Sequence, residues 1–453
     1  MKNKKLGQVF TPSFVVDTML KNLDFLGKTI LEPSFGKGAF LSECVRLYAQ
    51  SFLKKSNNLK QLKKELEQNI IGVEIDENLF EQCEQNLNQV AEEFNLKNVQ
   101  WNLICGDFLK VYPQFKNKID YVIGNPPYVR IHYLNKNLKQ FSKGGMTDLF
   151  LIFFDCGFKC LKEKGELIFI TPSSWLKSKA GLYLRKNIFY FKNLKKLIDF
   201  SFEQVFENIT TYSLISYFKK GVIFNEILLE DFQNPQNNRM IQYQDLFLPN
   251  CDIFLGNLQF KRIFNFKPLP VKNGFATNCD SFFFGDFKNQ NYPTIPIFKA
   301  SNGKWLDGIY PYDEQGNFKQ PTGEVLKRYA QFELILKKRD LQNQPWQAFA
   351  RTQGLKDTFF RKIAFNHLIK EIKDLRIVEV QSGAGVFGGY YLKTNLPLEF
   401  FNKVLKNKEF LEYVKSLGKY KNGGYYTFSS SDLGRFLAYK LSEENKLNEC
   451  TLY

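Results

Sequence analysis

Short apolar runs alternate with amphipathic stretches along the first 220 residues. Each run ends in a polar or glycine-containing turn, and several of the intervening stretches repeat apolar residues at helical spacing. The pattern predicts strands at 29–31, 70–75, 99–104, 121–123, 166–171, 196–200 and 212–218, and helices at 39–53, 147–161 and 179–188. This alternation is typical of an α/β, doubly wound domain. We therefore predict a mostly parallel seven-stranded sheet with a terminal antiparallel hairpin.

The alternation of strand and helix patterns ends after residue 225. Residues 232–250 are polar and rich in Asn and Gln, which predicts a linker. Residues 251–453 lose the alternation and contain short aromatic segments typical of strands, which predicts an α+β domain. A chain of 453 residues is long enough for two such cores. We expect domains at 1–235 and 236–453.

Acidic residues follow three successive predicted strands. Glu32 opens the turn 32–38, which carries Gly36 and Gly38 and leads into a helix. Glu74 closes the second strand, and Asp107 follows the third. Because the carboxyl ends of parallel strands share one crevice, we expect these acids to bind a nucleoside-bearing cofactor. The alternative at each position is a surface carboxylate that caps the next helix.

The fourth predicted strand ends in Gly124 and runs into Asn125-Pro126-Pro127-Tyr128. Consecutive prolines have fixed φ angles and no N–H, so the Pro126 carbonyl is a rigid acceptor beside the side-chain oxygen of Asn125. Two fixed acceptors beside the aromatic ring of Tyr128 suit the binding of a planar –NH2 group. The alternative is an ordinary proline-stiffened loop.

Two further positions depend on context. Thr11 and Pro12 are typical of a helix start, with Thr11 as the cap and Pro12 at the first helical position. Phe206 follows the predicted strand 196–200, where it is either a core residue or a second aromatic plate opposite Tyr128. The pattern alone leaves both roles open.

Charge and composition narrow the class of protein. The net charge is +17, and residues 221–453 hold 31 basic and 24 acidic side chains, which leaves +10 for residues 1–220. An excess of positive charge shared by both halves attracts nucleic acid, although the chain could also simply be rich in lysine.

With only His132 and His367 and no CxxC pair, no metal site is expected. No apolar run approaches a membrane span of ~20 residues. The start lacks the apolar core of a signal peptide, so a cytoplasmic location is expected.

Three segments of the second half combine glycine with aromatic or basic residues, at 293–305, 382–391 and 423–429. Flexible glycines beside aromatic and hydroxyl side chains suit contacts with bases and phosphates. The alternative is a set of β-turns in a second core.

With these motifs assembled, residues 1–220 resemble the S-adenosylmethionine-dependent DNA adenine-N6 methyltransferases of restriction–modification systems, in the gamma arrangement. Glu32 departs from the commoner Asp, and an insertion before residue 69 lengthens the first crossover. The resemblance implies a Rossmann-like methyltransferase domain followed by a DNA target-recognition domain. It rests on Phe10-Thr11-Pro12, Glu32-Pro33-x-x-Gly36-x-Gly38, Glu74-Ile75-Asp76, Gly106-Asp107-Phe108 and Asn125-Pro126-Pro127-Tyr128.

The resemblance also implies roles for single residues. Thr11 and Glu32 would face the methionine part of S-adenosylmethionine, and Glu74 would hold its ribose. Ile75 and Phe108 would enclose its adenine, with Asp107 accepting from the amino group. The implied cofactor-binding set is Thr11, Pro12, Glu32, Ser34, Gly36, Gly38, Glu74, Ile75, Asp107 and Phe108. The implied catalytic set is Asn125, Pro126, Pro127, Tyr128 and Phe206, around an adenine flipped out of duplex DNA.

Other functions stay open. Asn-Pro-Pro-Tyr also occurs in RNA-amine and protein glutamine-amide methyltransferases, and cytosine N4 presents nearly the same amino chemistry. A fused nuclease is not expected, because the cofactor motifs begin at residue 7 and no Asp…Glu-x-Lys cluster is recognisable after residue 250. We expect a monomer without membrane association. Its expected partners are double-stranded DNA and a separately encoded restriction endonuclease.

Overall fold

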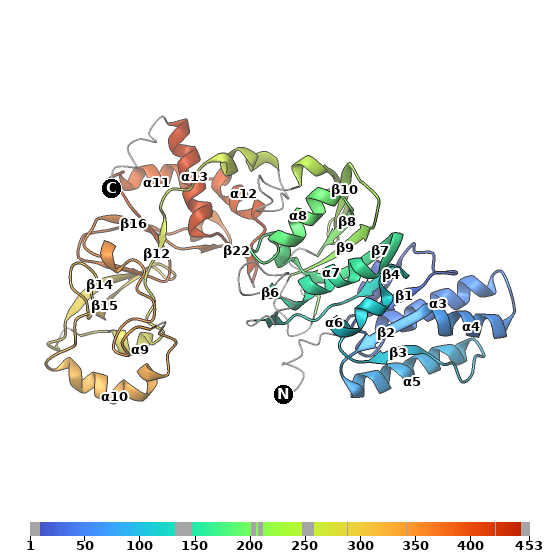
Figure 1. Cartoon of the computed structure of the whole chain (residues 1–453). Coiled ribbons are helices and arrows are strands. Elements are labelled where there is room, and N and C mark those ends of the chain that lie inside the picture. The colour runs from blue at the N-terminus through green and yellow to red at the C-terminus, as the bar shows by residue number, and fades with distance from the viewer. Residues whose placement is uncertain are drawn as a thin grey trace. The chain divides into compact units, whose positions relative to one another are not determined.

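The chain forms two compact units, Met1–Leu255 and Gly256–Tyr453 (Figure 1). The structure is a computed structural model, and it describes residues 10–131, 147–200, 205–206, 212–246, 258–287, 289–341, 343–421 and 423–444. His132 of the sequence analysis lies outside these residues. The division falls after the boundary that the sequence predicts at residue 235, because strands on both sides of that residue pair with each other.

One nine-stranded sheet forms the centre of the first unit. Its strands are β1 (Ile30–Glu32), β2 (Ile70–Glu74), β3 (Asn102–Cys105), β4 (Ile119–Gly124), β7 (Leu161–Pro172), β8 (Leu194–Asp199), β9 (Ser213–Lys219), β10 (Glu226–Asp231) and β11 (Arg239–Gln242). The order is β11-β10-β8-β9-β7-β4-β1-β2-β3. Neighbours from β7 to β3 are parallel, whereas β9 runs antiparallel to both β7 and β8. A separate small pair joins β5 (Arg130–Ile131) and β6 (Thr147–Asp148).

The sheet has two more strands than the seven predicted, and the linker prediction for 232–250 is wrong where β11 lies. β10 is parallel to β8, and β11 pairs antiparallel with β10. Ile227 and Ile241 face each other in this pair, and both are buried. Ile241 is the only buried residue of β11, so this edge strand carries too little apolar pattern to stand out among its polar neighbours.

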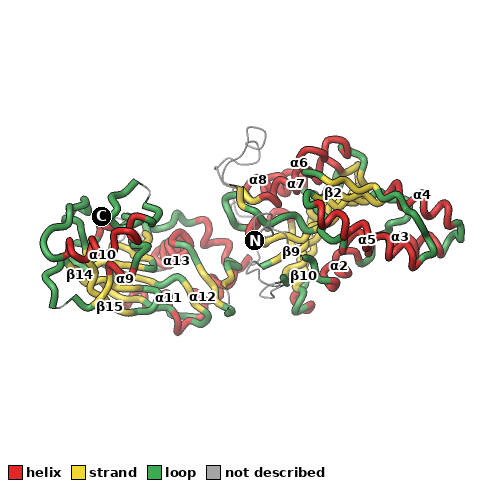
Figure 2. The backbone as a smooth tube through the Cα atoms, turned by 90° about the horizontal axis from the view of Figure 1, so that it is seen from below, coloured by secondary structure: helices red, strands yellow, loops and turns green. Residues whose placement is uncertain are grey.

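Alternate residues of the central strands enter two different cores. In β7, Leu167 and Phe169 belong to one core, and Ile168 and Ile170 to the other. Helices cover both faces of the sheet (Figure 2). One face packs against α2 (Ser13–Leu20), α3 (Ala39–Leu53), α4 (Leu59–Asn69) and α5 (Glu77–Glu93), and the other against α6 (Phe108–Val111), α7 (Leu149–Cys160) and α8 (Leu182–Phe191). Burial on both faces explains why the parallel strands are near-continuous apolar runs.

The second unit combines helices with several small sheets. Its described strands are β12 (Lys272–Asn273), β13 (Phe284–Gly285), β14 (Thr294–Lys299), β15 (Lys304–Ile309), β16 (Lys362–Phe365), β17 (Leu368–Ile369), β18 (Ile377–Val380), β19 (Gly385–Phe387), β20 (Tyr390–Lys393), β21 (Tyr420–Lys421) and β22 (Tyr425–Thr427). They form the sheets β12-β20-β16-β18, β13-β15-β14-β19 and β17-β22-β21. The α-helices are α9 (Asp280–Phe283), α10 (Val325–Lys337), α11 (Leu398–Leu405), α12 (Lys408–Ser416) and α13 (Ser430–Glu443).

The three glycine-containing segments of this unit are strands and tight turns. Segment 293–305 contains the β14–β15 hairpin, 382–391 contains β19 and β20, and 423–429 contains β22. A Cβ at Gly389 would overlap the side chain of Ala300 and the carbonyl of Phe365, so this glycine serves close packing. The β-turn alternative thus describes their structure, and contact with DNA stays a prediction.

Within the described ranges, none of the helices has the length and apolar character that a membrane crossing requires.

Candidate active site

A pocket opens at the carboxyl edge of the first unit's sheet. Strands β4, β1, β2 and β3 are adjacent and parallel, so the turns that follow them meet there. We call it the sheet-edge pocket. It is lined by Phe10, Pro33, Ser34, Gly36, Glu74, Ile75, Leu79, Gly106, Asp107, Phe108, Leu109, Asn125, Pro126, Pro127, Leu149 and Phe153. Residues from both predicted sets, cofactor-binding and catalytic, therefore share one pocket.

Some predicted residues lie beside this pocket without lining it. Thr11 contacts Asn125, and Glu32 directly precedes the lining residue Pro33. Pro12 is the cap residue of α2, and Gly38 that of α3. The remaining two, Tyr128 and Phe206, contact each other.

The glycine turn after β1 is held against the end of β2. The backbone N–H of Gly36 donates to Glu74 Oε2 at 2.9 Å. Glu74 Oε1 accepts from the N–H groups of Ile75 and Asp76 at 2.9 and 3.0 Å. Gly36 and Gly38 have φ angles of 55° and 79°, which favour glycine. One carboxylate thus fixes two turns of the pocket wall.

Glu32 is a buried carboxyl group with an exposed fraction of 2%. Burial raises its pKa well above the usual value; a backbone hydrogen bond from Leu41 opposes this rise, and the charge of Glu74 adds to it. Its Oε2 is buried without a hydrogen-bond partner among the residues that the structure describes. A buried acceptor in this state favours a ligand group that carries hydrogen-bond donors and positive charge.

Asp107, which follows β3, caps a helix, as the alternative in the sequence analysis predicts, and Asp76 after β2 also does so. Asp76 Oδ1 accepts from Asn78 N at 3.0 Å, and Asp107 Oδ1 accepts from Leu109 N at 2.9 Å. Asp107 also lines the sheet-edge pocket, so capping and ligand contact are compatible at this position. The exposed Ile75 lines the pocket as well.

Asn125 is oriented by residues distant in sequence. Its Nδ2 donates to Thr11 Oγ1 at 3.2 Å, and its backbone carbonyl accepts from Ser34 Oγ at 3.3 Å. The predicted Thr11 cap is wrong: α2 begins at Ser13, Pro12 is its cap residue, and no side chain caps it. The Thr11 hydroxyl fixes the Asn125 amide instead, which directs the amide nitrogen toward α2.

Tyr128 and Phe206 come together, but not as two parallel plates. Their ring centroids are 6.1 Å apart and their planes meet at 77°, which is an edge-to-face contact. The Tyr128 hydroxyl donates to the Ile170 carbonyl at 3.4 Å. Burial raises the pKa of Tyr128 well above its usual value, so the phenol is neutral. Phe206 is itself buried.

Known proteins resemble this chain over both of its units. The profile of the Eco57I restriction–modification methylases matches residues 20–206. Type II methyltransferase M.AccI of Acinetobacter calcoaceticus is 30% identical over 279 residues, which cover 59% of this chain and 45% of that protein. Modification methylase CviBIII of Paramecium bursaria Chlorella virus NC1A is 31% identical over 337 residues, which cover 71% of this chain and 72% of that protein. The chain belongs to the Eco57I restriction–modification methylase family.

Solved structures of restriction–modification enzymes resemble this chain in fold. The Type IIL restriction–modification enzyme MmeI, solved in complex with DNA, has a TM-score of 0.65 and 14% identity, over 92% of this chain and 64% of that one. The Type ISP enzyme LlaGI, solved with a DNA substrate mimic, has a TM-score of 0.58. The chain spans 45% of the length of M.AccI and 42% of that of M.BstVI, which is less than half of each.

The sequence analysis missed the apolar lining of the pocket in this methylase-family chain. Leu79, Leu149 and Phe153 line it beside the polar motifs. Their apolar periodicity within α5 and α7 is the same for a pocket wall as for a core, so it could not distinguish the two. Phe10 lines it too, with the ammonium of Lys37 4.7 Å from its ring centroid. The Phe10-Thr11-Pro12 motif was the available signal for this residue.

Proposed function

We propose that this chain transfers a methyl group from S-adenosylmethionine to the N6 amine of an adenine in duplex DNA. The observation that carries the proposal is a shared pocket. The acceptors of Asn125 and Pro126 line the same cavity as the acids Glu74 and Asp107. A cofactor held by the acids would thus adjoin the acceptors that hold a substrate amine.

The residues present fit the cofactor. S-adenosylmethionine, when bound, supplies an electrophilic methyl group on a sulfonium. Glu32 would hold the cofactor's ammonium, because a cation would satisfy its buried Oε2 and lower the pKa that burial has raised. Glu74 would accept from the ribose hydroxyls, and Asp107 from the adenine amino group.

Asn125 and Pro126 act on the substrate amine. The Asn125 side-chain oxygen and the Pro126 carbonyl accept its two N–H groups, which draws the nitrogen lone pair out of conjugation with the ring. Positive charge then develops on the nitrogen beside acceptors that are already in place, so no strong base is required. The methylated amine afterwards releases one proton to water. Thr11 positions the acceptor by binding the amide nitrogen of Asn125. A reaction that needs no strong base agrees with the sheet-edge pocket, whose described lining contains no histidine.

Access to N6 for in-line transfer requires the adenine to leave the base stack. Tyr128 and Phe206 turn from their edge-to-face contact to stack on the extruded base, at roughly 1–3 kcal/mol each. In this assignment the first unit, Met1–Leu255, forms the Rossmann-like catalytic part and the second, Gly256–Tyr453, the target-recognition part. The net charge of +17 supports duplex DNA as the partner.

The test is expression of the chain in cells that lack DNA methylation, followed by sequencing of genomic DNA for modified bases. Wild type is expected to place N6-methyladenine at one sequence motif. Asn125→Ala is expected to lose at least about 100-fold in methyl transfer, as when a preorganised transition-state group is removed. Calorimetry should find its affinity for S-adenosylmethionine within a few-fold of wild type.

The outcomes separate the alternatives. N4-methylcytosine in the genome would replace adenine as the target, and transfer of labelled methyl to RNA or protein alone would replace DNA as the substrate. Near-normal activity of Asn125→Ala, with an unchanged melting temperature, would refute the mechanism.

A further inference from the structure

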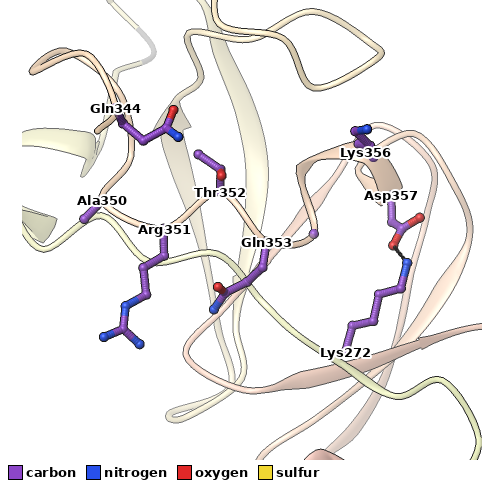
Figure 3. A pocket seen from close by; sticks show the side chains of 9 residues that line it. Lys272, Gln344, Ala350, Arg351, Thr352, Gln353, Lys356 and Asp357 are labelled. Atoms are coloured by element: carbon purple, nitrogen blue, oxygen red, sulfur yellow. Dashed lines mark hydrogen bonds and ion pairs between the residues drawn. The ribbon is translucent and has the colours of Figure 1, made fainter. Parts of the chain in front are cut away.

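The second unit has a polar pocket of its own, built mainly by one loop. It is lined by Lys272, Gln344, Ala350, Arg351, Thr352, Gln353, Gly354, Lys356 and Asp357 (Figure 3). We call it the loop pocket. In Figure 3 the side chains of Arg351 and Gln353 point to the same side of the loop, and Thr352 points to the other side, toward Gln344. No motif of the sequence analysis includes it.

The loop is held rigidly from beneath. Asp357 is buried and pairs with Lys272 at 2.6 Å, and it accepts from the Tyr391 hydroxyl at 2.8 Å. The buried ammonium of Lys362 donates to the carbonyls of Asp357, Thr358 and Phe360 at 2.8 to 2.9 Å. Because this buried ammonium donates hydrogen bonds to three backbone carbonyls, it fixes the end of the loop. The loop pocket is therefore preorganised.

The start of the loop is fixed as well. Arg351 forms a two-way backbone bridge with Ala276, with N–O distances of 2.9 and 3.2 Å. Gly354 then turns the chain with a φ of 89°, where a Cβ would press on the Tyr391 hydroxyl. The side chain of Arg351 is thus carried by a backbone that cannot shift freely.

The guanidinium of Arg351 differs in its surroundings from those of most other arginines of this unit. It is exposed, and among the described residues none accepts a hydrogen bond from its guanidinium. A guanidinium on a rigid support, uncommitted to the protein, favours a ligand with a pair of planar acceptors. Five other arginines of this unit do have protein acceptors: Arg328, Arg339, Arg361, Arg376 and Arg435.

The rest of the lining distinguishes a base edge from a phosphate. Gln344 presents an acceptor beside a donor; the Gln353 amide donates one N–H to the Gly274 carbonyl at 3.4 Å and retains a second N–H and its oxygen. Asp357 offsets the charge of Lys272, while Lys356 adds a positive charge to the lining. A phosphate has only acceptors, so amide oxygens and a carboxylate are poor neighbours for it. The edges of base pairs in the major groove alternate donors and acceptors, and Arg with Gln is the pairing that reads them.

We propose that the loop pocket reads base-pair edges of the DNA target, with Arg351 bound to the two acceptors of a guanine and Gln353 to a neighbouring base. The inference rests on the proposed function, since it assigns the sequence specificity of that reaction to named residues. Arg351 and Gln353 are specificity-determining residues here, distant in sequence from the residues that hold the methyl donor.

The test determines the methylated motif of wild type, Arg351→Ala, Arg351→Lys, Gln353→Ala and the control Arg262→Ala, by sequencing DNA from expressing cells. Arg262 is also exposed and uncommitted among the described residues, but it lies outside the pocket. Both Arg351 variants and Gln353→Ala are expected to lose roughly ten- to a hundred-fold discrimination at one base pair. Arg351→Lys is informative because it keeps the charge and loses only the planar fork.

The outcomes are decisive. Arg262→Ala is expected to methylate the wild-type motif with unchanged discrimination. If the Arg351 and Gln353 variants keep the motif and lose only overall rate, with a shallower salt dependence, the pocket binds phosphate and the inference is overturned. The same holds if Arg351→Lys behaves as wild type. A wild-type chain that methylates no DNA overturns the proposed function itself, a result that the variants cannot mimic. Melting temperatures within about 2 °C of wild type confirm folding.

Discussion

The two pockets of this protein are built in opposite ways. The sheet-edge pocket collects residues from Phe10 to Phe153, carried to one edge by parallel strands. The loop pocket takes nearly all of its lining from residues 344–357, held by buried charges beneath them. The first arrangement depends on the order of the strands, and the second on local support. Chemistry common to a family is therefore expected at the sheet edge, and properties that vary between relatives at the loop.

The strongest test of the sheet-edge pocket is Glu32→Gln. Loss of the carboxylate should weaken S-adenosylmethionine binding roughly 100-fold or more, because a buried cation would lose its partner. The same change should stabilise the ligand-free protein. The raised pKa of Glu32 means that its contribution to stability is present at low pH and is lost as pH rises through that pKa.

The advantage in melting temperature of Glu32→Gln over wild type should accordingly grow from pH 5 to pH 8. Calorimetry and thermal melts at both pH values measure the two effects. A variant that binds the cofactor normally would remove Glu32 from the site.

A second test compares two glycines of the first unit. Gly38 and Gly27 both have positive φ, at 79° and 70°. A Cβ at Gly38 would overlap the sulfur of Cys83, whereas a Cβ at Gly27 would have, beyond its two chain neighbours, no atom of the described residues within 4 Å. We expect Gly38→Ala to cost about 2–4 kcal/mol in the free energy of unfolding and Gly27→Ala about 1. Urea titration measures both, and equal costs would show that the turn is not tightly packed.

Thr11→Val tests whether the α2 entry positions the catalytic amide. Valine keeps the shape of Thr11 and removes the oxygen that accepts from Asn125 Nδ2, so methyl transfer should fall about tenfold at saturating substrate. The control is Thr18→Val within α2, the helix that follows Thr11; the Thr18 hydroxyl donates to Phe14 O, and this variant should leave the rate unaltered. A drop in both variants would indicate a general effect of the helix.

The smallest expected effect is a pH dependence of stability caused by Lys362, the buried lysine that supports the loop pocket. Burial lowers the pKa of Lys362 to about 8, and the charge of Asp357 opposes this. Between pH 8 and the higher pKa of an unfolded lysine, the unfolded chain binds a proton that the folded chain lacks. The contribution of Lys362 to stability should therefore rise with pH there, by at most about 1.4 kcal/mol per pH unit. Urea unfolding at pH 8 and 9.5 should show the difference in free energy of unfolding between wild type and Lys362→Met shift in favour of wild type, whereas the difference between wild type and the exposed control Lys370→Met should stay the same.

The sequence was informative where structure depends on neighbours in the chain. The apolar runs before Glu32, Glu74 and Gly124 predicted strands that the structure contains. It was uninformative where partners are distant: the bond between Asn125 and Thr11 spans 114 residues, and the local pattern suggested a helix cap. β11 was missed because one buried isoleucine is too weak a signal.

The loop pocket shows the same limit. The segment from Gln344 to Asp357 has no helical or strand period, and its only marks are one proline and one glycine. Its character depends on Lys272, Lys362 and Tyr391, which reach it from other strands. Such a site becomes visible only when the buried charges beneath it are seen together.

The edge-to-face contact between Tyr128 and Phe206 leaves no room for a base between the two rings. A base between two parallel rings needs roughly 7 Å between the ring planes. These rings, with centroids 6.1 Å apart and planes at 77°, must turn before one enters. Only a nucleotide already anchored by the rest of a duplex brings enough binding free energy to offset that reorganisation. Under the proposed function, free adenine nucleotides lack that anchor and are expected to be poor methyl acceptors.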